Sequence, residues 1–262
     1  TYFFISAEIE YHDCPVECSE EFSIIPVPWQ GDRFVEMDSN GELLWEWNTF
    51  DNISLTEYNP YYAETYNGTL ELDWTHSNSV LYDPLSESVY VSLRNLSRIT
   101  SIDYSTGQIN WNLGESDFME NPSFQNELDF SQQHSAQLTT SGNLIFFDNA
   151  RYQDPELSRC IEVEFDDSNE PFIAWQHVLP DSMFTGSRGE CDRLGSGNSL
   201  ISAGRTGNVI EVNSDNQLVW HLNVDDNHDN DVAIYRTERI LNLFPSIFSF
   251  TINQIIGDFS DY

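Results

Sequence analysis

The 262-residue sequence predicts an all-β protein, and three observations support that prediction. Many short stretches carry apolar or β-branched residues at every second position, as half-buried strands require. Turn sequences such as Asp83-Pro84 and Asn40-Gly41 separate these stretches. A hairpin that ends near a tryptophan recurs along the chain. The stretch 73–114 shows all three features, and it predicts four successive strands at 79–82, 88–93, 99–103 and 108–113.

The recurring hairpin predicts repeated units. Its tryptophans are Trp47, Trp111, Trp175 and Trp220, with spacings of 64, 64 and 45 residues. All-strand units of this length with one aromatic residue each indicate a β-propeller of four-stranded blades. We expect each tryptophan to pack between neighbouring blades. The blades that can be recognised are centred on residues 22–60, 70–115, 130–180 and 188–224.

The remaining segments are interpreted from the same patterns. Residues 1–11 and 22–27 each predict a strand, and 33–38 with 42–48 predicts the first hairpin. Further strands near the C-terminus bring the expected total to about six blades (five to six), with an edge blade closed by the N- and C-terminal strands. No linker divides the chain, so we expect one propeller domain over residues 1–262, trimmed at one or both ends. Long loops at 48–72, 115–130 and 150–157 are the places where a site is expected.

The charge of the chain limits its partners. There are 44 acidic residues against 10 basic ones, a formal net charge of −34, and every basic residue is arginine. Such a chain repels nucleic acid and anionic membranes, and it contains no apolar run of 18 residues for membrane insertion. A site for an anion must therefore concentrate the few arginines.

The cysteines indicate an oxidising compartment. Cys14 and Cys18 suggest a short disulfide loop, and Cys160 and Cys191 suggest a second bridge, although the sequence alone leaves the pairing open. An even cysteine count in an all-β chain favours an extracytoplasmic location, either periplasmic or secreted.

Histidine and arginine recur at corresponding points of the repeats. His76 and His134 precede the first strands of the second and third blades, and Arg188 stands before the first strand of the fourth. We align the two histidines as equivalent residues facing the central channel. Arginine binds oxyanions bidentately, and histidine can act as a nucleophile or a general acid or base. The pattern therefore favours an anion site, and no catalytic metal is predicted because arginine stands where carboxylate ligands would be needed.

One further segment carries alternating oxygen ligands. Asp225, Asn227 and Asp229 resemble a calcium loop, but the central glycine and terminal glutamate of an EF-hand are missing. A solvated loop is the alternative, and no other cofactor is expected.

Several motifs together resemble the arylsulfotransferase family of β-propellers: DWTHSNSVLYD, VYVSLRNLSRITSID, TGQINWNLG, FSQQHSAQL, GNLIFFDNAR, ELSR and GNVIEV. The resemblance covers residues 31–245. It implies a six-bladed propeller that transfers a sulfuryl group from a phenolic sulfate ester to another phenol through a sulfated histidine. By motif, the catalytic residues are His76, His134 and Arg151. The expected substrate-binding residues are Asn78, Arg94, Asn149, Arg159 and Arg188.

The chain departs from this family pattern in one place. In the bacterial enzymes the sulfated histidine lies in a later blade, which corresponds here to residues 187–194, where no histidine occurs. Either His76 or His134 is the nucleophile, or the alignment is displaced, or the chain does not catalyse the reaction. The alternative function is a non-catalytic secreted or surface propeller that binds an anionic ligand or a protein. The sequence does not indicate the oligomeric state.

Overall fold

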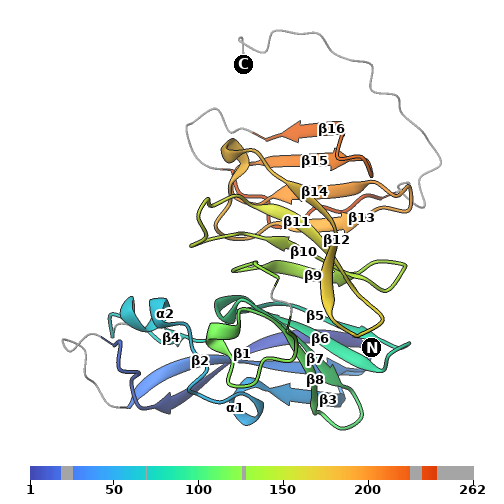
Figure 1. Cartoon of the computed structure of the whole chain (residues 1–262). Helices are drawn as coiled ribbons and strands as arrows, with labels where there is room; N and C mark the ends of the chain where they lie inside the picture. The colour runs from blue at the N-terminus through green and yellow to red at the C-terminus, as the bar shows by residue number, and fades with distance from the viewer. Residues whose placement is uncertain (19–25, 69, 126–127, 225–231, 241–262) are drawn as a thin grey trace.

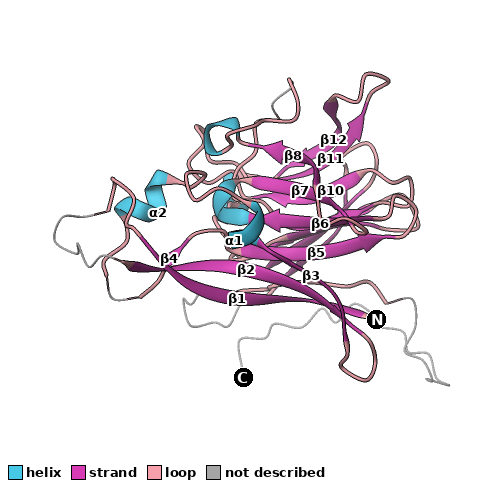
Figure 2. Ribbon diagram, turned by 90° about the horizontal axis from the view of Figure 1, so that it is seen from below, coloured by secondary structure: helices cyan, strands magenta, loops and turns pink. Residues whose placement is uncertain are grey.

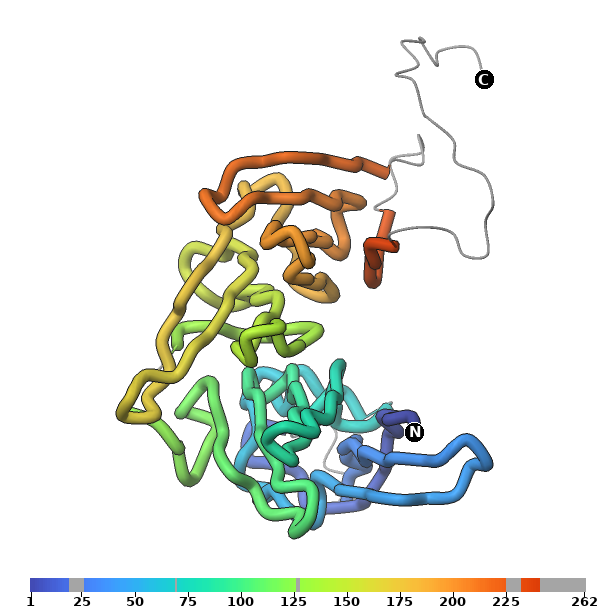
Figure 3. Tube along the Cα trace, turned by 90° about the vertical axis from the view of Figure 1, so that its right-hand side faces the viewer, coloured from blue at the N-terminus to red at the C-terminus, as the bar shows by residue number. Residues whose placement is uncertain are grey.

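The computed structural model describes residues 1–18, 26–68, 70–125, 128–224 and 232–240. In these residues the chain forms four sheets of four strands each, with only short helices beside them (Figure 1). The sheets follow one another along the chain, and viewed from the side they form an arc (Figure 3). These four sheets confirm the all-β prediction. No helix in this described part is long and apolar enough to cross a membrane.

The first sheet differs from the other three in its order. Strands β1 (Tyr2–His12), β2 (Val27–Met37) and β3 (Leu43–Asn48) are antiparallel, and the two-residue β4 (Leu72–Asp73) runs parallel to β2. Between β3 and β4, the predicted loop carries the short helices α1 (Thr49–Asn52) and α2 (Pro60–Glu64), which lie beside this sheet (Figure 2).

The other three sheets are antiparallel meanders in chain order. The second contains β5 (Ser77–Asp83), β6 (Ser88–Leu93), β7 (Arg98–Asp103) and β8 (Ile109–Gly114). The third contains β9 (His134–Leu138), β10 (Leu144–Asp148), β11 (Arg159–Phe165) and β12 (Pro171–Val178). The fourth contains β13 (Glu190–Arg193), β14 (Ser199–Ala203), β15 (Asn208–Val212) and β16 (Leu218–Asn223). These bounds confirm the four predicted strands of 73–114 to within two residues at each end.

Three apolar clusters lie between successive sheets, and the tryptophans belong to them. Trp47 is 3% exposed, and its Nε1 donates to Gly107 O of the second sheet at 3.0 Å. The ring of Trp111 lies 5.4 Å from that of Phe165 in the third sheet. Trp175 stacks with Arg193 of the fourth sheet at 4.4 Å. The predicted packing of tryptophan between sheets is thus confirmed at three interfaces.

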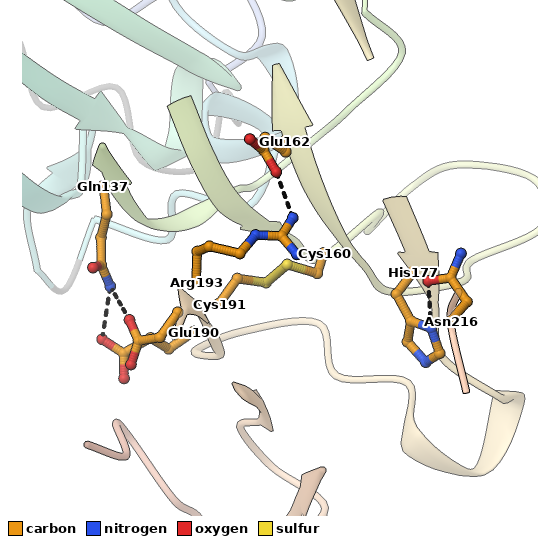
Figure 4. Close-up of a disulfide and its surroundings, with 9 residues drawn as sticks. Gln137, Cys160, Glu162, His177, Glu190, Cys191, Arg193 and Asn216 are labelled. Carbon is orange, nitrogen blue, oxygen red and sulfur yellow. Dashed lines mark hydrogen bonds and ion pairs between the residues drawn. A yellow bond between two sulfur atoms is a disulfide. The ribbon is translucent and has the colours of Figure 1, made fainter. Parts of the chain in front are cut away.

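Two disulfides are present, with the pairing Cys14–Cys18 and Cys160–Cys191. The second joins β11 to β13 and so ties the third sheet to the fourth (Figure 4). An ion pair between Glu162 and Arg193 connects the same two strands beside it. The contact between sheets is therefore covalent and ionic as well as apolar.

The expected closure of an edge blade is not seen among the described residues. β1 pairs along its whole length with β2, and no described C-terminal strand joins it. Residues 232–240 form no strand and lie beside the fourth sheet, where Arg236 pairs with Glu190 (Figure 3). The strand predicted at 22–27 falls mostly outside the described residues, although Val27 begins β2. The count of five to six blades stays a prediction.

Candidate functional site

The turns in front of β5 and β9 each contain one residue with positive φ, and this bears on the alignment of the histidines. Asp73-Trp74-Thr75 precedes one strand and Asp129-Phe130-Ser131 the other. The next residue adopts a left-handed conformation in both, with φ 48° at His76 and φ 56° at Gln132. Arg188 repeats it before β13 with φ 67°. By this left-handed residue His76 corresponds to Gln132, whereas the strand ladders pair Ser77 with Leu93 and His134 with Phe147. The equivalence of His76 and His134 stays a prediction.

His76 lies on the surface of this turn and contacts a carboxylate. Its Nδ1 is 2.6 Å from Asp73 Oδ2, and its side chain is 46% exposed. The left-handed conformation is costly for a residue other than glycine, so the neighbouring backbone must hold it. It does so through Arg94 N, which donates to His76 O at 3.4 Å, and Asn95 N, which donates to Thr75 O at 3.1 Å.

His134, the first residue of β9, is buried at 4% exposure. Burial lowers the pKa of its imidazole to about 3, and the nearby positive charges of Arg94 and of a protonated His76 act in the same direction. Its Nδ1 is 3.0 Å from Ser135 Oγ, and the ring of Tyr235 meets it edge-on with the ring centres 5.3 Å apart. His134 is therefore a neutral imidazole at neutral pH.

Arg94 follows β6 and is buried, with only 6% of the residue exposed. Its Nη1 donates to Tyr62 OH at 3.0 Å and to Asn95 Oδ1 at 2.9 Å. Its Nη2 donates to Gly186 O at 3.2 Å. Its Nε has no hydrogen-bond partner, and none of its partners is a carboxylate among the residues described here. A buried guanidinium without a counter-ion favours an anion as its missing partner.

Arg151 approaches the same place from the loop after β10. Its guanidinium lies over two tyrosine rings, 4.9 Å from the centre of Tyr152 and 5.8 Å from that of Tyr61. These residues line a cleft of about 620 Å³. Burial raises the pKa of Tyr62, while the nearby charges of Arg94 and Arg151 oppose that rise, so both arginines act on this one phenol.

The arginines of the chain fall into two groups. Six form ion pairs with carboxylates: Arg33, Arg98, Arg159, Arg193, Arg236 and Arg239. Within the described residues, the other four have no carboxylate partner: Arg94, Arg151, Arg188 and Arg205.

The four unpaired arginines all meet the loop 185–189. Arg94 donates to its Gly186 O, and the side chain of Arg151 lies next to the Cα of the same glycine. Arg188 belongs to the loop, and Arg205 Nη1 is 3.5 Å from Ser187 Oγ. In a chain of net charge −34, the approach of Arg94 and Arg151 to Tyr62 and Gly186 is the electrostatic feature that points to an anion.

Three of the predicted substrate-binding residues have their side chains bound to protein. Asn78 donates to Gln133 O and accepts from Ser135 N, which joins the second and third sheets. Asn149 Nδ2 donates to Thr185 O at 2.6 Å and to Arg188 O at 2.8 Å, which holds the loop 185–189. Arg159 Nε is 2.8 Å from Asp148 Oδ2, where it satisfies a buried carboxylate. Of the remaining two, Arg94 also donates hydrogen bonds to protein groups but has no carboxylate partner among the described residues, and Arg188 is a residue of the loop itself.

The sequence reasoning missed two residues of this cluster. Asp73 stands three residues before His76, and its position in the D-W-x-H motif was the available signal. Tyr62, which connects Arg94 to Gln132 through hydrogen bonds of 3.0 and 2.7 Å, lies in a long insertion with no repeat to mark it.

The described residues contain no group of three or more metal-ligating side chains. The calcium candidates Asp225, Asn227 and Asp229 lie outside the described residues.

Fold and site together define an all-β protein of successive four-stranded sheets with an arginine and histidine cluster at the ends of its strands. Comparison with known families places it more narrowly. The model of the family Arylsulfotransferase (ASST) matches residues 26–236, and the chain belongs to that family.

Comparison with solved structures gives distant similarities. One is to a protein of unknown function from Bacteroides caccae, with 14% identity and a TM-score of 0.44, covering 75% of this chain and 55% of that one. Another is to virginiamycin B lyase from Staphylococcus aureus, with 9% identity and a TM-score of 0.41, covering 86% of this chain and 61% of that one. The chain thus spans 55% and 61% of the lengths of these two proteins. No curated protein matches the sequence.

Proposed function

We propose that this protein transfers a sulfuryl group from an aryl sulfate to a phenolic acceptor at the cluster around the loop 185–189. The observation that carries the proposal is the approach of Arg94 and Arg151 to Gly186 in a loop that also contains Arg188 and contacts Arg205, since none of these arginines has a carboxylate partner among the described residues. Membership of the arylsulfotransferase family supports sulfuryl transfer as the chemistry. A loose, anionic transfer needs fixed positive charge and positioning above all.

The roles follow from the surroundings of each side chain. Arg94 and Arg151 bind the sulfuryl oxygens, because a guanidinium stays charged and offers two parallel donors. His134 is neutral at working pH, and its ring is hydrogen-bonded within the protein, so it supports the site rather than supplying a charge. One of the two histidines accepts the group covalently, since the loop 187–194 that would carry the family's nucleophile contains none.

The proposal also covers the domain that carries the site and the compartment in which the protein acts. The four sheets belong to a single propeller domain of five to six blades, and the exposed outer strand supports this. Trp220 on β16 is 44% exposed, whereas the corresponding tryptophans of the other sheets pack against the next sheet. Two disulfides support an extracytoplasmic location, periplasmic or secreted.

The test is a transfer assay with a chromogenic aryl sulfate and a phenol acceptor. We expect release of the coloured phenol that depends on the acceptor, together with formation of the sulfated acceptor. Arg151→Gln should lower kcat/KM by about 10²-fold or more, because it removes a charge at the developing anion. The matched control is Arg33→Gln, an exposed arginine already paired with Glu46, which should keep wild-type activity. If the wild-type chain releases no phenol, or if both variants lose activity equally, the proposed function is wrong.

A further inference from the structure

The two histidines differ in what their ring nitrogens can do. His134 Nδ1 faces Ser135 Oγ at 3.0 Å, its ring makes a backbone hydrogen bond with Gly189, and Tyr235 covers it. The ring of His76 is half exposed, and its one partner among the residues described is Asp73, which it meets through Nδ1. Nε2 of His76 is therefore the ring nitrogen that has no hydrogen-bond partner among the described residues.

Asp73 is held in place on both its main chain and its side chain. As the last residue of β4 it pairs with Gln30 of β2, whose Nε2 is 3.5 Å from Asp73 Oδ1. Asn95 Nδ2 donates to Asp73 O at 2.7 Å. Since a carboxylate only accepts hydrogen bonds, the contact between Asp73 Oδ2 and His76 Nδ1 places the hydrogen on Nδ1. In the neutral ring the lone pair is then on Nε2.

We propose that His76 is the histidine that accepts the sulfuryl group, and that Asp73 is its positioning residue. The inference rests on the proposed function and decides between the two histidines that it leaves open. Asp73 fixes the tautomer and the direction of the His76 ring, as the carboxylate of a Ser-His-Asp triad does for its histidine.

The reaction balances without a redox partner. His76 Nε2 attacks the sulfur of the aryl sulfate, a nitrogen–sulfur bond forms, and the bond from sulfur to the aryl oxygen breaks. The aryl oxygen leaves with the electron pair and takes a proton from water. The acceptor oxygen then attacks the same sulfur and loses its proton to water, while the nitrogen–sulfur bond breaks and restores the neutral ring. During the intermediate the ring carries a positive charge, which the Asp73 carboxylate faces across Nδ1–H.

The test uses Asp73→Ala and Asp73→Asn in the intact chain, with the same chromogenic aryl sulfate. Both variants should lower kcat by about 10²- to 10⁴-fold with little change in KM, because the ring loses its orientation and its counter-charge. Added formate should restore part of the activity of Asp73→Ala, since a small carboxylate can occupy the vacated position. A residue that only supports the fold would not respond to formate.

The matched control is Glu10→Ala. Glu10 is another carboxylate in contact with a histidine, since its Oε2 lies 2.9 Å from His12 Nε2 on β1, outside the cluster. This variant should keep a kcat within about twofold of wild type and show no response to formate.

Mass spectrometry of wild-type protein with donor and no acceptor completes the test. We expect one added SO₃ group on His76. A group on another residue, or wild-type kcat in both Asp73 variants, overturns this inference and leaves the proposed function standing. Absence of both transfer and adduct in the wild type overturns both.

Discussion

The turns before β5 and β9 share a residue with positive φ and differ in the side chain that stands there. Each begins with an aspartate and an aromatic residue and then enters the left-handed region, at His76 in one and Gln132 in the other. In the second sheet this position carries an exposed histidine beside its aspartate. In the third sheet it carries a buried glutamine, and the histidine stands two residues later inside the protein.

The two turns differ in what their left-handed residue contacts. Gln132 Nε2 donates to Arg94 O at 3.2 Å, and its Oε1 accepts from Tyr62, so the turn of the third sheet supports the arginine of the second. In the proposed reaction the second sheet supplies the nucleophile and the third sheet supplies this support. Three substitutions test this division, from the largest expected effect to the smallest.

The largest effect is expected from His76→Gln, which gives the second turn the side chain of the third. Transfer should fall by roughly 10⁴-fold or more, because the group that forms the covalent bond is removed. The transfer assay measures the loss, and mass spectrometry should find no sulfated histidine. His177→Gln, a histidine on β12 that contacts Asn216, is the control and should keep full activity. Retention of a tenth of the activity in His76→Gln would contradict the division.

The next effect is expected from Arg94→Gln. Removing the buried charge should lower kcat/KM by about 10²- to 10³-fold, the usual result of deleting one oxyanion donor. The free energy of unfolding should fall by about 1–3 kcal/mol, because buried acceptors such as Asn95 Oδ1 and Gly186 O lose their donor. Inorganic sulfate should raise the melting temperature of the wild type and not that of the variant, and thermal unfolding at several sulfate concentrations measures both. Equal stabilisation of the two proteins would show that the anion binds elsewhere.

The smallest effect is a pH dependence of stability at His134. Burial lowers its pKa to about 3 from 6.5, so the unfolded chain takes up a proton below about pH 6.5 that the folded protein takes up only near pH 3. This contribution to stability is complete above pH 6.5 and is lost as the pH falls, by about 1.4 kcal/mol per pH unit at most.

The variant His134→Gln isolates this contribution. Burial raises the pKa of Glu190 to about 7, which has the opposite sign, since its stabilisation is complete below pH 4.5 and is lost as the pH rises through 7. Glu190 contributes equally to the free energy of unfolding of wild type and variant. The difference between the two proteins therefore reports the contribution of His134 alone. Denaturant unfolding from pH 7 to pH 4 should show a shallower decline in the variant. Parallel curves for the two proteins would mean that His134 is not held neutral by the fold.

Much of the fold could be predicted because each strand is marked by a pattern of neighbouring residues in the sequence. Strands β6 and β7 match their predicted ranges to within one residue, since alternation and turn residues lie within a few positions of each other. The order of the first sheet could not be predicted, because the pairing of β4 with β2 joins residues more than forty positions apart. Among the site residues, Arg94 and Arg151 were visible as rare charges at repeat points. Whether Asn78 and Asn149 have free side chains depended on contacts between sheets.

The sequence alone determined the all-β class, the four repeats and the scarcity of positive charge, because these follow from local patterning and composition. It also placed two histidines and several arginines at the ends of strands. Only the tertiary structure decided which of them are buried and which arginines lack a carboxylate among the described residues. Exposure and ion pairing are set by neighbours from other sheets, and these neighbours are distant in the chain.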